Sequence, residues 1–281
     1  MRTRTEESAN YHSVFIDGKT LRFQIDPDRP ITELRFPEFY DVGINTWCGG
    51  RCSYCYTDAK AAGVHFPQIA AKIQQFFGAM SLNERPYQVA LGGSGEATAH
   101  PEFTAALQAF RELDIIPNYT TNGMHLSDPV LDATIEYCGG VAVSCHPHLE
   151  RHWRDAIRKL CQLKIKLNLH VVVSDRESIQ QLTALFQEYQ PLVDYFVILP
   201  YMTAGRAAKR PIDFQALEAW VDSVQDFGNI AFGSNLFEFL GDKARWDLSL
   251  YPPEIMSKYL IMDDGLSLYN NSFQMKRVHR P

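Results

Sequence analysis

Short β-rich runs alternate with amphipathic stretches of helical length from about residue 38 onward. Between the β-rich runs the apolar residues recur at helical spacing, as Ile69, Ile73 and Phe76 do. Parallel strands joined by crossover helices have this order of elements. The pattern therefore predicts an α/β fold in which six strand–helix units form a partial barrel. The expected strands are 39–45, 87–93, 116–122, 141–146, 166–174 and 195–202, with 230–237 as a possible further strand.

Two segments flank this region. Residues 13–26 and 259–269 each hold two β-rich runs around an Asp-Gly pair, which favours a hairpin turn. We expect residues 1–37 to form an N-terminal extension with one hairpin and residues 38–240 to form the barrel. Residues 241–281 are then a C-terminal extension with the second hairpin. A chain of 281 residues is long enough to bury the core of one such domain.

Composition limits the classes of partner. The formal charge of -6 provides no broad basic field, which argues against binding of duplex nucleic acid. The first residues are polar, and no uncharged apolar run approaches the length of a membrane span, so we expect a cytoplasmic protein without a membrane partner. Six cysteines are too few for a disulfide scaffold, and three of them lie within eight residues. Metal or redox chemistry is the better explanation.

Those three cysteines, Cys48, Cys52 and Cys55, share one loop directly after the first expected strand. Three thiolates can bind three irons of a cubane and leave the fourth iron open to a chelating small molecule. Catalytic zinc sites leave a position open in the same way. Gly49 and Gly50 let the backbone wrap closely around such a cluster and donate N–H groups to it.

Polar residues alternate with apolar ones on two later strands. Ser144 and His146 lie between the apolar residues of the fourth strand, and Asn168 and His170 between those of the fifth. The apolar sets should face the helices, because a strand alternates its side chains between two faces. The four polar residues should then point into the barrel. Such an interior indicates a ligand cavity and not a packed core.

The pattern CxxxCxxC, with aromatic Tyr54 just before the last cysteine, resembles the signature of the radical S-adenosylmethionine (radical SAM) superfamily. The resemblance covers roughly residues 38–237 and implies a partial (β/α)6 barrel of the TIM type. One departure is Ala97, which stands where family members often have proline. Further segments that match in order are Gly92-Gly93-Ser94-Gly95-Glu96, Thr120-Thr121-Asn122-Gly123, Leu199-Pro200-Tyr201 and Gly205-Arg206.

The resemblance implies an oxygen-sensitive 4Fe-4S cluster and S-adenosylmethionine as cofactors, with a flavodoxin or ferredoxin as electron donor. The enzyme would cleave S-adenosylmethionine reductively to a 5′-deoxyadenosyl radical, which abstracts hydrogen from a substrate. Tyr54 would lie near the adenine. Ser144 and Asn168 are candidates for the ribose or carboxylate on strand position alone. The catalytic cluster ligands would be Cys48, Cys52 and Cys55, and the methionyl end would be held by Gly92, Gly93 and Glu96.

The substrate is not encoded in any motif, nor is the outcome after hydrogen abstraction. We find no recognisable SPASM domain, meaning no cysteine-rich C-terminal module for auxiliary clusters, and no evident leader-peptide-binding domain. These features favour a small molecule or nucleoside-type substrate. The alternative is a peptide-modifying enzyme, either an epimerase or a cross-linking maturase.

Two other classes of protein stay open. Cys52 and Cys55 could form half of a zinc site in a structural or nucleic-acid-binding module, although the chain has no second CxxC. A cluster could also serve an electron carrier, which would more often supply four protein ligands. Cys145 could donate hydrogen to a substrate radical, but its outward position favours a small core residue. We interpret His148 and His152 as part of a helix start, because no complete metal-ligand set is evident.

Overall fold

One large, mostly parallel β-sheet is the main element of the fold. The computed structural model of the chain describes residues 1–207, 213–224, 229–233, 236 and 256–272. Nine described strands form this sheet in the order β10-β9-β8-β7-β6-β5-β4-β11-β12, and neighbours from β4 to β10 are parallel. The parallel strands are β4 (Phe39–Gly43), β5 (Gln88–Leu91), β6 (Ile116–Thr121), β7 (Gly140–Ser144), β8 (Lys166–Val173), β9 (Tyr195–Pro200) and β10 (Ile230–Phe232).

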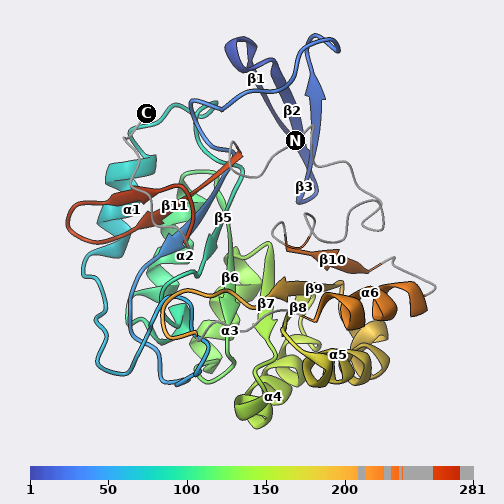
Figure 1. Cartoon of the computed structure of the whole chain (residues 1–281). Coiled ribbons are helices and arrows are strands. Elements are labelled where there is room, and N and C mark those ends of the chain that lie inside the picture. The colour runs from blue at the N-terminus through green and yellow to red at the C-terminus, as the bar shows by residue number, and fades with distance from the viewer. Residues whose placement is uncertain (208–212, 225–228, 234–235, 237–255, 273–281) are drawn as a thin grey trace.

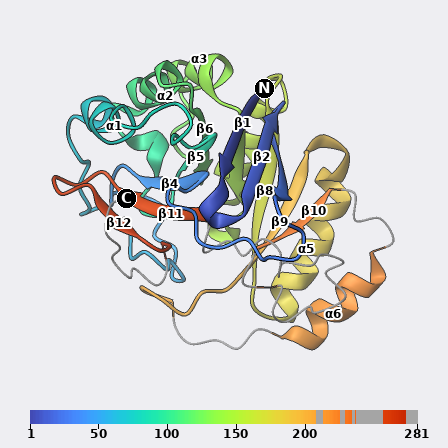
Figure 2. The same cartoon turned by 90° about the horizontal axis from the view of Figure 1, so that it is seen from above.

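Each of the strands from β4 to β9 is followed by one helix, and the helices lie outside the sheet (Figure 1, Figure 2). The helices α1 to α3 flank one part of the sheet, and α5 and α6 flank the other (Figure 2). The predicted partial (β/α)6 barrel is therefore confirmed, including the further strand at Ile230–Phe232. The helices are α1 (Ile69–Phe77), α2 (Phe103–Glu112), α3 (Asp128–Tyr137), α4 (Glu150–Leu160), α5 (Arg176–Tyr189) and α6 (Phe214–Ser223). Short 3-10 helices are Glu7–Ala9, Ala97–Ala99, Pro147–Leu149 and Gln190–Leu192.

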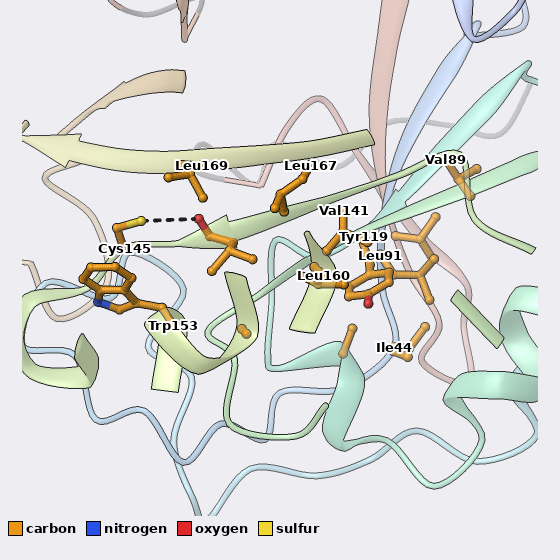
Figure 3. Close-up of a cluster of buried hydrophobic side chains, with 14 of the residues drawn as sticks. Ile44, Val89, Leu91, Tyr119, Val141, Cys145, Trp153, Leu160, Leu167 and Leu169 are labelled. Atoms are coloured by element: carbon orange, nitrogen blue, oxygen red, sulfur yellow. Dashed lines mark hydrogen bonds between the residues drawn. The ribbon is translucent and has the colours of Figure 1, made fainter. Parts of the chain in front are cut away.

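The core lies between the sheet and the helices. Figure 3 shows Val141 of β7 and Leu167 and Leu169 of β8 near Trp153 and Leu160 of α4, and all five side chains are buried. These positions alternate along their strands, as the sequence pattern predicted. Cys145 belongs to the same core, and its Sγ lies 3.9 Å from the carbonyl oxygen of Val143 (Figure 3). Its interpretation as a small core residue fits this position.

A three-stranded antiparallel sheet closes the amino end of the barrel. It consists of β1 (Arg2–Glu6), β2 (Tyr11–Ile16) and β3 (Lys19–Gln24), and it stands apart from the helices in Figure 1. The expected hairpin turn is present, with Asp17 and Gly18 at positive φ. Lys166, the first residue of β8, donates a hydrogen bond of 3.1 Å to the carbonyl oxygen of Asp17. Arg2 does the same to Asp114, just before β6, at 2.7 Å.

The C-terminal hairpin joins the barrel sheet. β11 (Ser257–Ile261) and β12 (Ser267–Tyr269) are antiparallel, as the sequence predicts, but β11 also pairs in parallel with β4. The hairpin thus extends the sheet beyond its first strand. Residues 241–255 and 273–281 of the expected C-terminal extension lie outside the described residues. Among the helices that are described, none combines the length and the apolar character needed to cross a membrane.

Candidate active site

The three cysteines lie in the long loop between β4 and α1, at the carboxyl end of β4. The loop folds back on itself, because the N–H of Cys48 bonds to the carbonyl oxygen of Lys60 at 3.1 Å and Lys60 bonds back to Thr46 at 3.3 Å. Cys52 is buried, Cys48 and Cys55 are half-buried, and all three are free thiols. Barrel enzymes place their chemistry at this end of their strands.

The sulfur atoms are close enough to influence one another. Burial, together with the neighbouring Cys48 and Cys55, raises the pKa of the Cys52 thiol to about 12. Burial also raises the pKa of Cys48. Three thiolates in one buried loop repel each other, so they require positive charge between them. Bound iron would supply that charge.

Hydrogen-bond donors surround Cys48. The N–H of Gly50 lies 3.4 Å from its Sγ, and Nδ2 of Asn122 lies 3.6 Å from it. A Cβ on Gly50 would come within 3.3 Å of that Asn122 nitrogen, so the small residue leaves room for the donor. Three thiols with such donors have the chemistry that a 4Fe-4S cluster requires. Across the described residues, no group of three or more His, Cys, Asp and Glu side chains is arranged to hold a metal ion.

The glycine-rich segment after β5 packs directly on the cysteine loop. The N–H of Glu96 bonds to the carbonyl oxygen of Trp47 at 2.8 Å, and Asn45 Nδ2 bonds to the carbonyl oxygen of Glu96 at 2.8 Å. A Cβ on Gly95 would lie only 2.2 Å from Asn45 Oδ1 and 2.4 Å from the Trp47 oxygen. Only glycine allows this approach. Gly93 has a φ of +76°, which also favours glycine.

The Glu96 carboxylate is buried and fully paired within the protein. Oε1 accepts hydrogen bonds from the hydroxyls of Thr98 at 2.5 Å and Thr121 at 2.7 Å, and Oε2 accepts from the N–H of Asn122 at 2.8 Å. Glu96 thereby ties the segment after β5 to the segment after β6. Since Asn122 also contacts Cys48, the carboxylate connects both segments to the cysteine loop.

Arg206 anchors the cysteine loop from the segment after β9. Its guanidinium donates hydrogen bonds to the carbonyl oxygens of Cys52 at 3.3 Å and Ala59 at 2.7 Å. The backbone N–H of Arg206 donates to the carbonyl oxygen of Cys55 at 2.9 Å. Gly205 has a φ of +58°, and a Cβ there would lie 2.4 Å from the Tyr56 oxygen. The motif Gly205-Arg206 was found in the sequence, but contacts to main-chain oxygens leave no sequence pattern that would predict its partner.

Two histidines contact the same loop from the segment after β7. Tyr54 Oη and His146 Nδ1 share a hydrogen bond of 2.9 Å, and His148 Nε2 lies 2.8 Å from the carbonyl oxygen of Gly50. Burial lowers the pKa of both His146 and His170 to about 4, so both rings are neutral at neutral pH. Asn168 Oδ1 is buried without a hydrogen-bond partner. An orphaned buried acceptor of this kind suits a ligand donor.

A cavity of about 210 Å³ opens beside Tyr54. Of the residues predicted to bind the cofactor, Tyr54 lies in the cavity wall, whereas Ser144 and Asn168 lie outside it. Tyr201 belongs to a segment that the sequence also indicated, but most of this wall carries no motif, because its residues lie at strand ends and on the first turns of a helix. The cavity is lined by Tyr54, Cys145, Pro147, Val171, Val172, Asp175, Glu177, Ser178, Gln181, Leu185 and Tyr201.

No protein-family model and no curated protein match the chain. Several solved structures match it. Streptococcus suis SuiB bound to S-adenosylmethionine matches with a TM-score of 0.65 and 16% identity, over 85% of this chain and 61% of SuiB. SuiB bound to its precursor peptide SuiA matches with a TM-score of 0.68 and 15% identity, over 89% and 63%.

The enzyme anSMEcpe with bound S-adenosylmethionine matches with a TM-score of 0.61 and 13% identity, over 87% of this chain and 75% of that chain. This chain therefore spans about three fifths of the length of SuiB. Both proteins are radical SAM enzymes. The six strand–helix units, the nine-stranded sheet and these matches together show that the chain has the fold of the radical SAM enzymes.

Proposed function

We propose that the chain is a radical SAM enzyme that cleaves S-adenosylmethionine reductively and abstracts hydrogen from a bound substrate. One observation carries the proposal: a loop of three free thiols lies at the carboxyl end of β4, against the glycine-rich segment after β5, in this fold. A bound 4Fe-4S cluster would supply the single electron that splits the sulfonium into methionine and a 5′-deoxyadenosyl radical. A flavodoxin or ferredoxin would supply that electron to the protein.

The residues of the chain bind and orient. Cys48, Cys52 and Cys55 would hold the cluster, and Arg206 fixes the loop that carries them. Gly92 and Gly93 would hold the methionyl end, together with Glu96, because their segment bonds to the cysteine loop through Ser94 and Glu96. A radical formed far from the substrate would react with other groups first. The hydrogen bonds of this region fix the positions of the cysteine loop and the glycine-rich segment, and this would keep the sulfonium close to the substrate.

The cavity beside Tyr54 is our candidate for the nucleoside site. Its wall combines two phenol rings, Tyr54 and Tyr201, with the aliphatic Val171. Aromatic and aliphatic walls suit a purine, and the polar side chain of Gln181 can bond to its edge or to the ribose. The position of Tyr54 within the cysteine loop keeps this site next to the cluster ligands.

Replacing Tyr54 tests this assignment. Tyr54→Ala should raise the dissociation constant for S-adenosylmethionine about tenfold or more, because a ring of the cavity wall is lost. Tyr54→Phe is the matched control: it keeps the ring, removes only the hydrogen bond to His146 and should stay within about threefold of the wild type. Equilibrium dialysis of the anaerobically reconstituted protein measures both. Equal affinities for the wild type and Tyr54→Ala would exclude the cavity as the nucleoside site.

A peptide substrate is the second candidate. The similar structures include SuiB bound to the precursor peptide SuiA and anSMEcpe with the Kp18Cys peptide. These structures favour the peptide-modifying alternative more than the sequence did. A small molecule or nucleoside-type substrate is our first proposal, and competition between peptides and small molecules for hydrogen abstraction would decide between the two.

Anaerobic reconstitution tests the proposed function directly. We expect a brown protein that contains iron and sulfide and that forms 5′-deoxyadenosine when S-adenosylmethionine and dithionite are added. An electron carrier would hold a cluster but leave S-adenosylmethionine intact. A colourless protein containing zinc would instead establish the structural or nucleic-acid-binding module.

A further inference from the structure

A carboxylate faces the interior of the barrel from the middle of β4. Tyr40 and Val42, on either side of Asp41, are fully buried, and Tyr40 packs edge-on against Phe76 and Phe77 of α1. Since α1 lies outside the sheet, Asp41 must point the other way, into the barrel. The sequence analysis gave this residue no role.

Asp41 lies beside both segments that would hold the cofactors. Its register partner on β11 is Tyr259, whose hydroxyl donates a hydrogen bond of 3.1 Å to the carbonyl oxygen of Gly93. Tyr56, the residue after Cys55, is its other aromatic neighbour. The Asp41 charge raises the pKa of the phenols of Tyr56 and Tyr259, although burial is the larger cause for both. Asp41 is therefore near the cysteine loop and near the glycine-rich segment.

The Asp41 carboxylate has no partner among the described residues: it takes part in no side-chain hydrogen bond and in no ion pair. Two fully buried carboxylates of the chain are paired within the protein. Glu96 accepts three hydrogen bonds, and Glu38 is paired with Tyr11 and Arg22. Burial alone raises the pKa of Asp41 to about 6, which leaves it ionised at neutral pH.

Asp41 is half-buried, and an ionised carboxylate without a protein partner inside the barrel is costly, so a charge of opposite sign would be bound there. A protonated Asp41 that donates a hydrogen bond within the protein is the structural alternative, but no described residue accepts one from it. The position close to both cofactor segments is where a substrate must lie to meet a short-lived radical.

We propose that Asp41 binds a cationic group of the substrate, an ammonium or a guanidinium, and thereby positions the substrate inside the barrel. This inference rests on the proposed function, because only an enzyme of that kind makes the bound cation a substrate. It narrows the substrate class to cationic molecules, whether small molecules or peptides with a basic side chain. Asp41 acts as a binding and positioning residue, and it takes no part in bond breaking.

The test uses the full chain, anaerobically reconstituted with S-adenosylmethionine, and two probes of equal size. The cationic probe is n-pentylammonium and the neutral one is 1-pentanol, each measured by equilibrium dialysis at pH 7.5. Asp41→Asn should weaken n-pentylammonium binding at least about tenfold and leave 1-pentanol binding unchanged. Asp132→Asn, an exposed carboxylate on α3, is the matched control and should bind both probes as the wild type does.

The wild type alone provides a second measurement, should Asp41→Asn fold poorly. Its affinity for n-pentylammonium should be constant above pH 6 and fall about tenfold per pH unit below it, because the cation needs the ionised carboxylate. The other titratable groups that face Asp41, Tyr56 and Tyr259, have raised pKa values and stay protonated throughout this range. The affinity for 1-pentanol should not change with pH.

Equal binding of n-pentylammonium to the wild type and a folded Asp41→Asn, or a flat pH profile, would overturn the inference. The proposed function has its own readout in the same preparation, the formation of 5′-deoxyadenosine by the wild type without any probe. If that product forms and the cation shows no dependence on Asp41, only the inference fails. If binding depends on Asp41 and no 5′-deoxyadenosine forms, the cation site stands and the proposed function fails.

Discussion

Cys52→Ala is expected to abolish both iron retention and cleavage of S-adenosylmethionine. Cys52 is the most buried of the three thiols, and its carbonyl oxygen accepts a hydrogen bond from Arg206, which alanine would preserve. The change therefore removes a proposed cluster ligand and leaves the loop anchored. Loss of partners that merely support a metal ligand already costs about 10 to 100-fold in metal affinity or activity, and loss of a ligand should cost more. Iron and sulfide per chain and 5′-deoxyadenosine measure the outcome.

Cys161→Ala is the control for this variant. Cys161 is exposed at the end of α4, and its Sγ lies 3.7 Å from the carbonyl oxygen of Leu192. Such a surface change usually alters the free energy of unfolding by less than about 0.5 kcal/mol. We expect normal iron content and normal turnover. Full activity in Cys52→Ala would contradict the assignment of the cluster.

Local patterns predicted most of the fold. Each of the strands from β4 to β9 overlaps an expected run, because buried parallel strands are apolar and bounded by turn residues. The expected runs continued two residues past β4, β5, β7 and β9, into segments such as Gly92 and Gly93 that belong to the candidate site. There the backbone leaves the sheet to reach the neighbouring loops.

The parts that the sequence did not predict depend on contacts between distant residues. β1 is a polar strand, RTRTE, and what identifies it is its pairing with β2 and the bonds from Arg2 to the start of β6. The pairing of β11 with β4 joins segments more than 200 residues apart, so no local pattern indicates it.

The candidate site divides in the same way. The spacing of Cys48, Cys52 and Cys55 identified the cysteine loop, because three thiols so close together have few other uses. Arg206 acts on main-chain oxygens, and the importance of Asp41 comes from the absence of a partner. Neither the contacts of Arg206 nor the missing partner of Asp41 can be predicted from the sequence without the fold. The roles of Ser144 and Asn168 stay predictions.

Glu96→Ala should separate cofactor binding from cluster binding. Without the carboxylate, the hydroxyls of Thr98 and Thr121 and the N–H of Asn122 lose their acceptor inside the protein. The two hydroxyls lie 3.4 Å apart and can partly satisfy each other, so we expect a loss of about 3 kcal/mol in the free energy of unfolding. The three thiols are unchanged, so the reconstituted protein should remain brown.

The affinity of Glu96→Ala for S-adenosylmethionine should fall at least about tenfold, because the segment proposed to hold the methionyl end is no longer tied to Asn122 and the cysteine loop. Glu102→Ala is the matched control. Its carboxylate accepts from the N–H groups of Gln68 and Ile69 at the start of α1, at 2.9 Å each, and its loss should cost about 1 kcal/mol of stability. It should bind S-adenosylmethionine normally. Dialysis and thermal unfolding measure both variants, and unchanged affinity in a folded Glu96→Ala would show that the glycine-rich segment does not hold the cofactor.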